Sequence, residues 1–160
     1  MTTRQEAIDI LERGHATIRR LTKQIPPHWM ARSGLGDGDW SPKDLLGHLG
    51  AFEVRFADVV AGFVGEAPES DLMSADPRTF NDDQAAVRKD WPLDQVMAEF
   101  LEAHQRVMQL AKVISAEVWR EVGTIPWYGP EYSLNDLVVY QQYGHKREHD
   151  PQLSAVLERR

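Results

Sequence analysis

The sequence contains no cysteine among its 160 residues. A thiolate nucleophile, a cysteine-based zinc site and a disulfide framework are therefore excluded. The N-terminus also lacks the basic segment followed by an apolar one that forms a secretion signal. The sequence therefore predicts a cytoplasmic protein.

Positive charge is scarce as well, because 18 Lys and Arg residues stand against 25 Asp and Glu residues, for a net charge of −7. Proteins that bind nucleic acid neutralise phosphates with clustered Lys and Arg, so we expect no nucleic-acid partner. Long apolar runs are also missing, since the run from Val59 to Val64 is short and Gly62 interrupts it. A membrane span needs about 20 apolar residues, so we expect no membrane partner.

What the chain does have is four long segments with apolar residues at helical spacing. We predict long helices at residues 4–25, 42–64, 92–114 and 134–149. Pro151 is expected to end or kink the last one, a shorter helix is predicted at 79–89, and only 124–132 has an extended pattern. The sequence therefore predicts an all-α fold, a four-helix bundle in a single domain over residues 1–160.

Two of the six histidines share one face of the fourth predicted helix. His145 and His149 are four residues apart, about 40° on the helical wheel, in the same arc as Leu134 and Val138. We therefore expect the pair to face the bundle interior. Such a pair can chelate one divalent ion. The alternative is a pair of partly buried histidines that form hydrogen bonds with their neighbours.

A third ligand must come from another helix, and depth along the bundle selects it. His48 lies about 9 Å from the start of the second predicted helix, and His145 lies about 7.5 Å from the end of the fourth. The two residues share a level only if these helices are antiparallel. This requires the 65–91 connection to cross the full length of the bundle. We therefore predict an up-down-down-up order with a long crossover between the second and third helices.

The same measure gives the remaining histidines structural roles. His104 lies about 18 Å into the third predicted helix, about 9 Å too deep for the site, and is expected to be a core or second-layer residue. His15, at the edge of the apolar arc of the first helix, is also expected to be structural. His28, between Pro27 and Trp29, is expected to lie in a loop.

The segment from Trp40 to Leu49 (WSPKDLLGHL), followed by HKREH at residues 145–149, resembles the DinB/YfiT-like superfamily of metal-dependent enzymes over nearly the whole chain. The resemblance implies a four-helix bundle with a long crossover after the second helix. It also implies a metal held by one histidine on the second helix and an HxxxH pair on the fourth. Carried over to this chain, the metal ligands are His48, His145 and His149. Some members have glutamate at the position of His145.

This superfamily includes thiol S-transferases that use bacillithiol or mycothiol, a mycothiol-dependent maleylpyruvate isomerase, and ClbS-like hydrolases. The segment from Pro126 to Gly129 (PWYG) is similar to a segment of the ClbS-like group. Family analogy also implies a homodimer.

Three neutral imidazoles leave a divalent metal, with zinc or nickel the first choices, its full charge and an open position. Metal-bound water or the thiolate of a low-molecular-weight thiol would then act on a small electrophilic substrate. Because the chain has no cysteine, that thiol would come from solution. We therefore predict a metal-dependent transferase or hydrolase. The alternatives are a non-catalytic protein that sequesters a metal or small molecule, and a metal-free structural bundle.

Other side chains are expected to support the site. Candidates for orienting the imidazoles through their second ring nitrogens are Asp44, Glu53 and Gln141. Of these we favour Gln141, because it falls on the interior arc of the fourth helix. Aromatic candidates for the wall of the site are Trp40, Trp127 and Tyr132. By the same helical phase, Tyr140 and Tyr143 fall on the side opposite the ligands.

Overall fold

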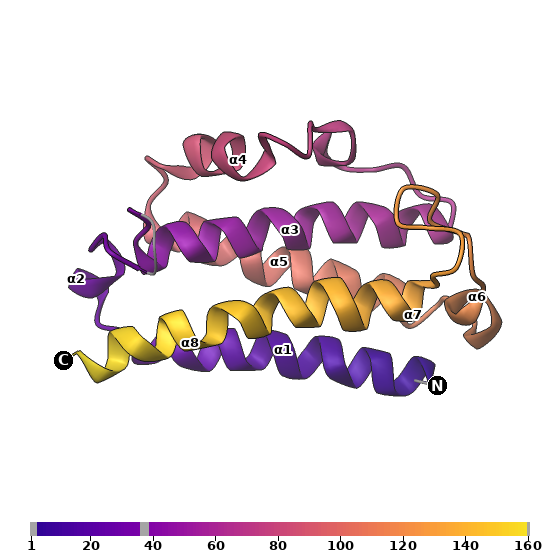
Figure 1. Ribbon diagram of the computed structural model, residues 1–160, viewed down its shortest axis with the longest axis horizontal. Helices are drawn as coiled ribbons and strands as arrows, with labels where there is room; N and C mark the ends of the chain where they lie inside the picture. The colour runs from indigo at the N-terminus through magenta and orange to yellow at the C-terminus, as the bar shows by residue number, and fades with distance from the viewer. Residues whose placement is uncertain (1–2, 36–38, 160) are drawn as a thin grey trace.

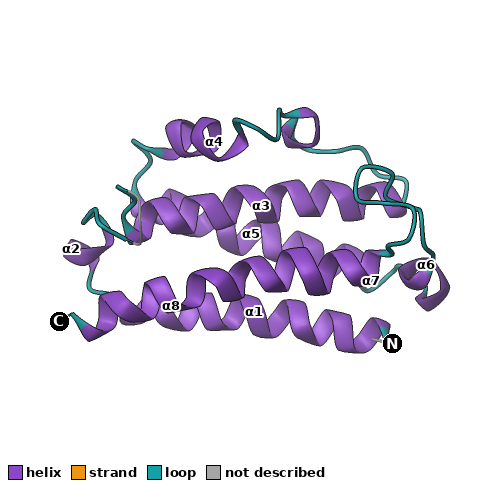
Figure 2. Ribbon diagram, viewed as in Figure 1, coloured by secondary structure: helices purple, strands orange, loops and turns teal. Residues whose placement is uncertain are grey.

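The computed structural model describes residues 3–35 and 39–159, and within these ranges the chain forms helices and loops without a strand (Figure 2). The long helices are α1 (Arg4–Gln24), α3 (Pro42–Phe63), α5 (Leu93–Ala111) and α8 (Gly144–Glu158). The short helices are α2 (Pro27–Met30), α4 (Phe80–Arg88), α6 (Ala116–Arg120) and α7 (Leu134–Asp136). A 3-10 turn (Leu72–Ser74) precedes α4, and a π-helical segment (Leu137–Tyr143) joins α7 to α8.

The order of the long helices confirms the predicted fold. Figure 1 shows that α1 and α8 run in one direction and that α3 and α5 run in the other. The chain between α3 and α5, which includes α4, returns along the outside of the bundle to the end where α3 began. The protein is therefore an all-α four-helix bundle with a long crossover, in the up-down-down-up order, and α3 is antiparallel to α8.

The end of the crossover is anchored by a partly buried ion pair. The Arg88 guanidinium at the end of α4 donates to both carboxylate oxygens of Glu99 on α5, at 2.6 and 2.9 Å. The pair passes over α3 at Gly47 and Gly50, where a Cβ atom would lie only 3.3 Å from Arg88 and 3.0 Å from Glu99. These glycines therefore let the crossover lie close to α3, one residue from His48.

The start of the crossover is fixed in a similar way. Asp58 on α3 accepts hydrogen bonds from the backbone N–H groups of Glu69 and Ser70, at 2.8 and 3.1 Å. The same carboxylate accepts a bond from Arg106 on α5 at 2.7 Å. Both ends of this long connection are thus tied to the bundle by charge-assisted hydrogen bonds, which are roughly twice as strong as neutral ones.

Two apolar clusters form most of the core, and a polar layer separates them. The first cluster includes Leu11, Phe56, Val107 and Val138. The second includes Ile18, Leu49, Phe100 and Leu153. Between the two clusters, each long helix contributes one buried polar residue, and these four are His15, Glu53, His104 and Lys146. His104, predicted as a core or second-layer residue, and His15, predicted to be structural, are both buried.

The last helix continues beyond its predicted end. Pro151 does not end it, because α8 continues through the proline to Glu158. A proline inside a helix loses one backbone hydrogen bond and crowds the preceding turn. Here the turns after Pro151 bury Leu153 and Val156 in the second cluster, and this packing holds the helix together. The 124–132 segment, which had an extended pattern, forms turns.

Within the described ranges, no helix combines the length and the apolar character that a membrane span requires.

Candidate metal centre

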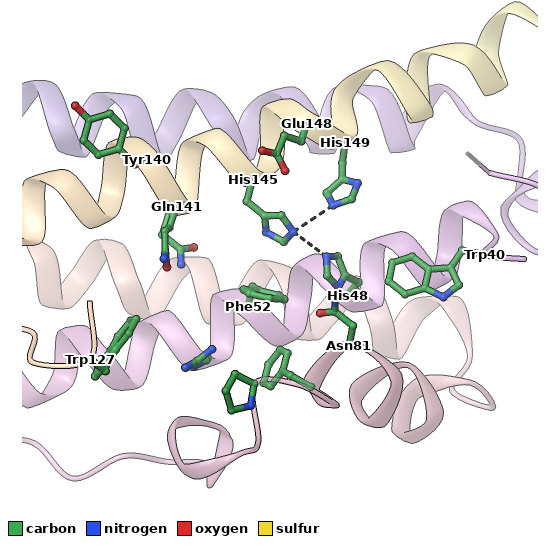
Figure 3. A pocket seen from close by; sticks show the side chains of 14 residues that line it. Trp40, His48, Phe52, Asn81, Trp127, Tyr140, Gln141, His145, Glu148 and His149 are labelled. Atoms are coloured by element: carbon green, nitrogen blue, oxygen red, sulfur yellow. Dashed lines mark hydrogen bonds between the residues drawn. The ribbon is translucent and has the colours of Figure 1, made fainter. Parts of the chain in front are cut away.

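Three histidines from two antiparallel helices meet at one point. His48 on α3 and His145 on α8 have their Nε2 atoms 2.7 Å apart, and the Nε2 atoms of His145 and His149 are 3.1 Å apart. One ring nitrogen from each residue lies within 4.8 Å of the other two. Figure 3 shows the three rings pointing toward one another, with His145 between the other two. The structure therefore brings together the three residues that the sequence singled out.

Hydrogen bonding alone does not account for this arrangement. An imidazole nitrogen either carries one proton or offers one lone pair, so it takes part in one strong in-plane hydrogen bond. His145 Nε2 has two close nitrogen neighbours, and at most one of these contacts is a hydrogen bond. A shared cation instead satisfies all three nitrogens together, because each one presents its lone pair to the same point.

The nitrogen separations fit a metal ion. A zinc ion lies about 2.1 Å from each imidazole nitrogen, which separates neighbouring nitrogens by about 3.0 Å at right angles and about 3.4 Å at tetrahedral angles. The observed separations of 2.7 and 3.1 Å lie near the lower of these values. A small outward movement of the rings therefore admits the ion, and the donor set of three imidazoles suits zinc, nickel or copper.

The surroundings keep the rings of His48 and His145 neutral, which is the form that binds a metal. Burial, with smaller contributions from the neighbouring His145 and His149, lowers the pKa of His48 to about 3. Burial likewise lowers the pKa of His145 to about 4, with a second contribution from His149. At neutral pH each of these two rings therefore has one nitrogen without a proton that can bind a metal.

The ring of His149 has a fixed orientation. Its Nδ1–H donates to Gln152 Oε1 at 2.6 Å, so in the neutral ring Nε2 is the nitrogen with the free lone pair, and it faces His145. Gln152 was not predicted as a site residue because it lies beyond Pro151, where the predicted helix ended. Its spacing of three residues from His149 would have identified it in a helix that continued.

None of the three predicted orienting residues contacts the histidines through a hydrogen bond in the described ranges. Asp44 belongs to the capping box of α3, where it accepts from the backbone N–H of Ser41 at 2.9 Å. Glu53 forms a buried ion pair with Lys146. Gln141, predicted on the interior arc, is exposed and lines the pocket instead.

The three histidines border a pocket of about 770 Å³. This pocket lies between α3, the start of α8 and the crossover. The aromatic residues that line it are Trp40, Phe52, Phe80, Trp127 and Tyr140. Figure 3 shows Trp40 and Trp127 at opposite ends, with His48, Phe52 and His145 between them. The prediction that His145 and His149 face the bundle interior is therefore wrong, since both rings are half-buried and border this pocket.

Two aromatic rings hold the imidazoles in place. Phe52 lies one turn after His48 on α3, and its ring centre is 4.9 Å from that of His48 and 4.5 Å from that of His145. Trp40 covers the other side of His48, at 4.9 Å. Trp40 and Trp127 line the pocket as predicted, whereas Tyr132 packs on Tyr128 at 4.9 Å and does not.

The polar layer contains a second group, His15, Glu53 and His104, whose ligand-type atoms also lie within 4.8 Å of one another. Two features favour a structural role for it. The rings of His15 and His104 are stacked face to face, 3.7 Å apart and 3° from parallel, so their in-plane lone pairs run side by side and do not converge. The Glu53 carboxylate already has a cation, the Lys146 ammonium.

The chain is similar to one known protein family and to one solved structure. Residues 11–137 match the family described as mycothiol maleylpyruvate isomerase N-terminal domain. A crystal structure of an uncharacterised protein from Escherichia coli UTI89 is similar to this structure, with a TM-score of 0.79 and 10% sequence identity, over 99% of this chain and 95% of that one. At that identity the likeness shows the fold alone. A comparison with curated proteins gives no match.

Proposed function

The chain belongs to the mycothiol maleylpyruvate isomerase N-terminal domain family, and on that premise we propose that it is a metal-dependent enzyme of the DinB/YfiT-like superfamily. We assign one divalent cation, zinc or nickel, to His48, His145 and His149. The reaction is the transfer of a small thiol, or of water, to a small electrophilic substrate.

One observation supports the proposal above all others. His145 Nε2 has a second imidazole nitrogen on each side, at 2.7 and 3.1 Å, and two such contacts on one nitrogen call for a shared cation. The low pKa values of His48 and His145 agree with this, because the rings stay unprotonated at neutral pH. The pocket supplies room for a substrate of modest size beside the rings.

When bound, the cation would act as a Lewis acid and lower the pKa of water or of a thiol. The protein's own groups do the rest. Gln152 Oε1 accepts a hydrogen bond from the Nδ1–H group of His149 and so fixes its tautomer. Phe52 and Trp40 pack against His48 and limit the water around it. A thiol must come from solution, because the chain has no cysteine.

Metal analysis of protein purified without a histidine tag tests the metal assignment. We expect about one zinc or nickel ion per chain after titration and dialysis, and a loss of that ion in His48→Ala. His28→Ala is the matched control, because His28 is exposed on α2, away from the pocket. Uptake below about 0.2 equivalents by the wild-type protein would overturn the assignment.

A second measurement separates an enzyme from a protein that only sequesters a metal. The metal-loaded protein is incubated with a low-molecular-weight thiol and a panel of small electrophiles, and product formation is followed by mass spectrometry. We expect turnover that His48→Ala abolishes and His28→Ala retains. Metal binding with equal product formation in the wild type and in His48→Ala would leave the sequestering role and refute the catalytic one.

A further inference from the structure

Arg55 lies in the pocket wall and has no charged partner. It follows His48 by seven residues on α3, so the two side chains lie on the same face, about 10.5 Å apart along the helix axis. Both residues line the pocket, with Phe52 between them. In the described part of the chain Arg55 forms no ion pair and no hydrogen bond, and its Nε is buried without a partner.

The lack of a charged partner distinguishes Arg55 from two other arginines that are at least partly buried. Arg88 is paired with Glu99, and Arg106 is paired with Asp58. Glu148 is the one acidic residue among those that line the pocket, and it forms no ion pair with Arg55 in the described ranges. An unpaired guanidinium that has lost part of its water is costly, and burial lowers the pKa of Arg55 accordingly.

Two aromatic rings hold this guanidinium in position. Its central carbon lies over the ring of Phe80 at 5.4 Å and over the ring of Trp127 at 5.3 Å. Phe80 begins α4 in the crossover, and Trp127 precedes α7, so the site is assembled from three separate parts of the chain. Aromatic rings stabilise a cation over their faces but do not neutralise it. The N–H groups at the edge of the guanidinium remain for another ligand.

The rest of the pocket lining indicates the chemistry of the remainder of that ligand. Apart from the histidines, the lining is mostly aromatic between Trp40 and Trp127 (Figure 3). The amide side chains of Asn81 and Gln141 add neutral polar groups. A ligand that spans from the histidines to Arg55 therefore has an apolar or unsaturated body and an anionic end.

We propose that Arg55 is a substrate-recognition residue that binds an oxyanion, a carboxylate or a phosphate, on the substrate of this site. The inference names the substrate class of the pocket and so rests on the proposed function. A guanidinium presents paired N–H donors that match the two oxygens of such a group. The anion supplies the charge that the protein itself does not provide, and it places the body of the substrate along Phe52 toward the histidines.

Binding of simple probes to protein treated with EDTA tests this without any need for the metal. The probes are benzoate, phenyl phosphate and the neutral isostere benzamide, titrated while the indole N–H signal of Trp127 is followed by NMR. Trp127→Phe identifies that signal among the five tryptophans. We expect benzoate or phenyl phosphate to bind at least about tenfold more tightly than benzamide, in line with a charge-assisted pair. The tighter of the two anions identifies the oxyanion source.

The matched variants are Arg55→Gln and Arg32→Gln. Arg32 also lies over a tryptophan ring, that of Trp29 at 4.2 Å, but it is outside the pocket. We expect Arg55→Gln to weaken the binding of the anions at least about tenfold and Arg32→Gln to leave it unchanged. Equal binding of benzoate, phenyl phosphate and benzamide by the wild type would overturn the proposal, and so would the absence of binding at millimolar concentrations. Unchanged anion binding in Arg55→Gln would also overturn it.

Metal uptake, measured on the same samples, keeps this proposal separate from the proposed function. Arg55→Gln is expected to take up metal as the wild type does, because Arg55 does not touch the three histidines. Anion binding that depends on Arg55 in a protein that takes up no metal would refute the metal assignment and support the oxyanion site. Metal uptake without anion binding would support the metal assignment and refute the oxyanion site.

Discussion

The stacked histidines of the polar layer make the fold sensitive to acid. Burial, with a smaller contribution from Arg19, lowers the pKa of His104 to about 4. Burial also lowers the pKa of His15 to about 2, with contributions from His104, Lys146 and Arg19. In the unfolded chain both rings titrate near the ordinary value of 6.5. Between these values the unfolded protein binds protons that the folded protein does not, so stability falls as the pH is lowered through this window.

The size of the effect follows from the linkage between protonation and folding. Each such ring contributes about 1.36 kcal/mol per pH unit below its unfolded pKa. When the pH is lowered from about 7.5 to about 5, the last 1.5 pH units, roughly, lie below the unfolded pKa of the rings. Each ring therefore lowers the free energy of unfolding by about 2 kcal/mol. That is a large part of the 5–15 kcal/mol typical of a domain of this size.

Urea denaturation of EDTA-treated protein, followed by far-UV circular dichroism, measures this loss. We expect His104→Leu to lose about 2 kcal/mol less than the wild type between about pH 7.5 and about pH 5. His28→Leu should lose as much as the wild type, because an exposed ring is solvated in both states. Equal losses in His104→Leu and the wild type would show that the stacked rings are not held neutral by burial, and the reasoning would be refuted.

Three further variants probe the contacts that position the site. Lys146→Met leaves the Glu53 carboxylate buried without its cation, and we expect a loss of about 3–5 kcal/mol in urea denaturation, which Glu53→Leu in the same chain should largely restore. Arg88→Met removes the anchor of the crossover, and a similar loss together with faster proteolysis near α4 is expected; unchanged cleavage would contradict the anchoring role. Gln152→Leu frees the ring that it orients, so calorimetry should show metal affinity lower by about tenfold to a hundredfold with little change in stability.

The meeting of His48 with His145 and His149 was predictable from the sequence because it depends on two fixed properties of an α-helix. The turn of about 100° per residue puts a four-residue pair on one face, and the rise of 1.5 Å per residue sets the level of each histidine. Only the direction of the helices remained open, and the length of the 65–91 connection decided it. The structure has that direction, with α3 antiparallel to α8.

The pocket was less predictable because it is built by segments that are irregular in sequence. Phe80 and Asn81 reach it from the crossover, and Trp127 reaches it from a loop of turns. The helix predicted at 79–89 is short, and the 124–132 segment forms turns, so the direction of their side chains could not be read from the sequence. Arg55, by contrast, shared a helical face with His48. Its isolation from any carboxylate became visible only when the partners of Arg88 and Arg106 were known.

The π-helical segment explains why the faces of the last helix were assigned incorrectly. A π-helix bonds each residue to the fifth one along and so turns less per residue than an α-helix. Over the seven residues of Leu137–Tyr143 the faces therefore drift from the phase that a continuous α-helix would give. Val138 remains in the core, while His145, predicted on the same arc, borders the pocket. The same drift lets the next residue, Lys146, reach Glu53 in the polar layer. The wide turn thus allows one helix to contribute to the buried ion pair and to the histidine cluster at neighbouring positions.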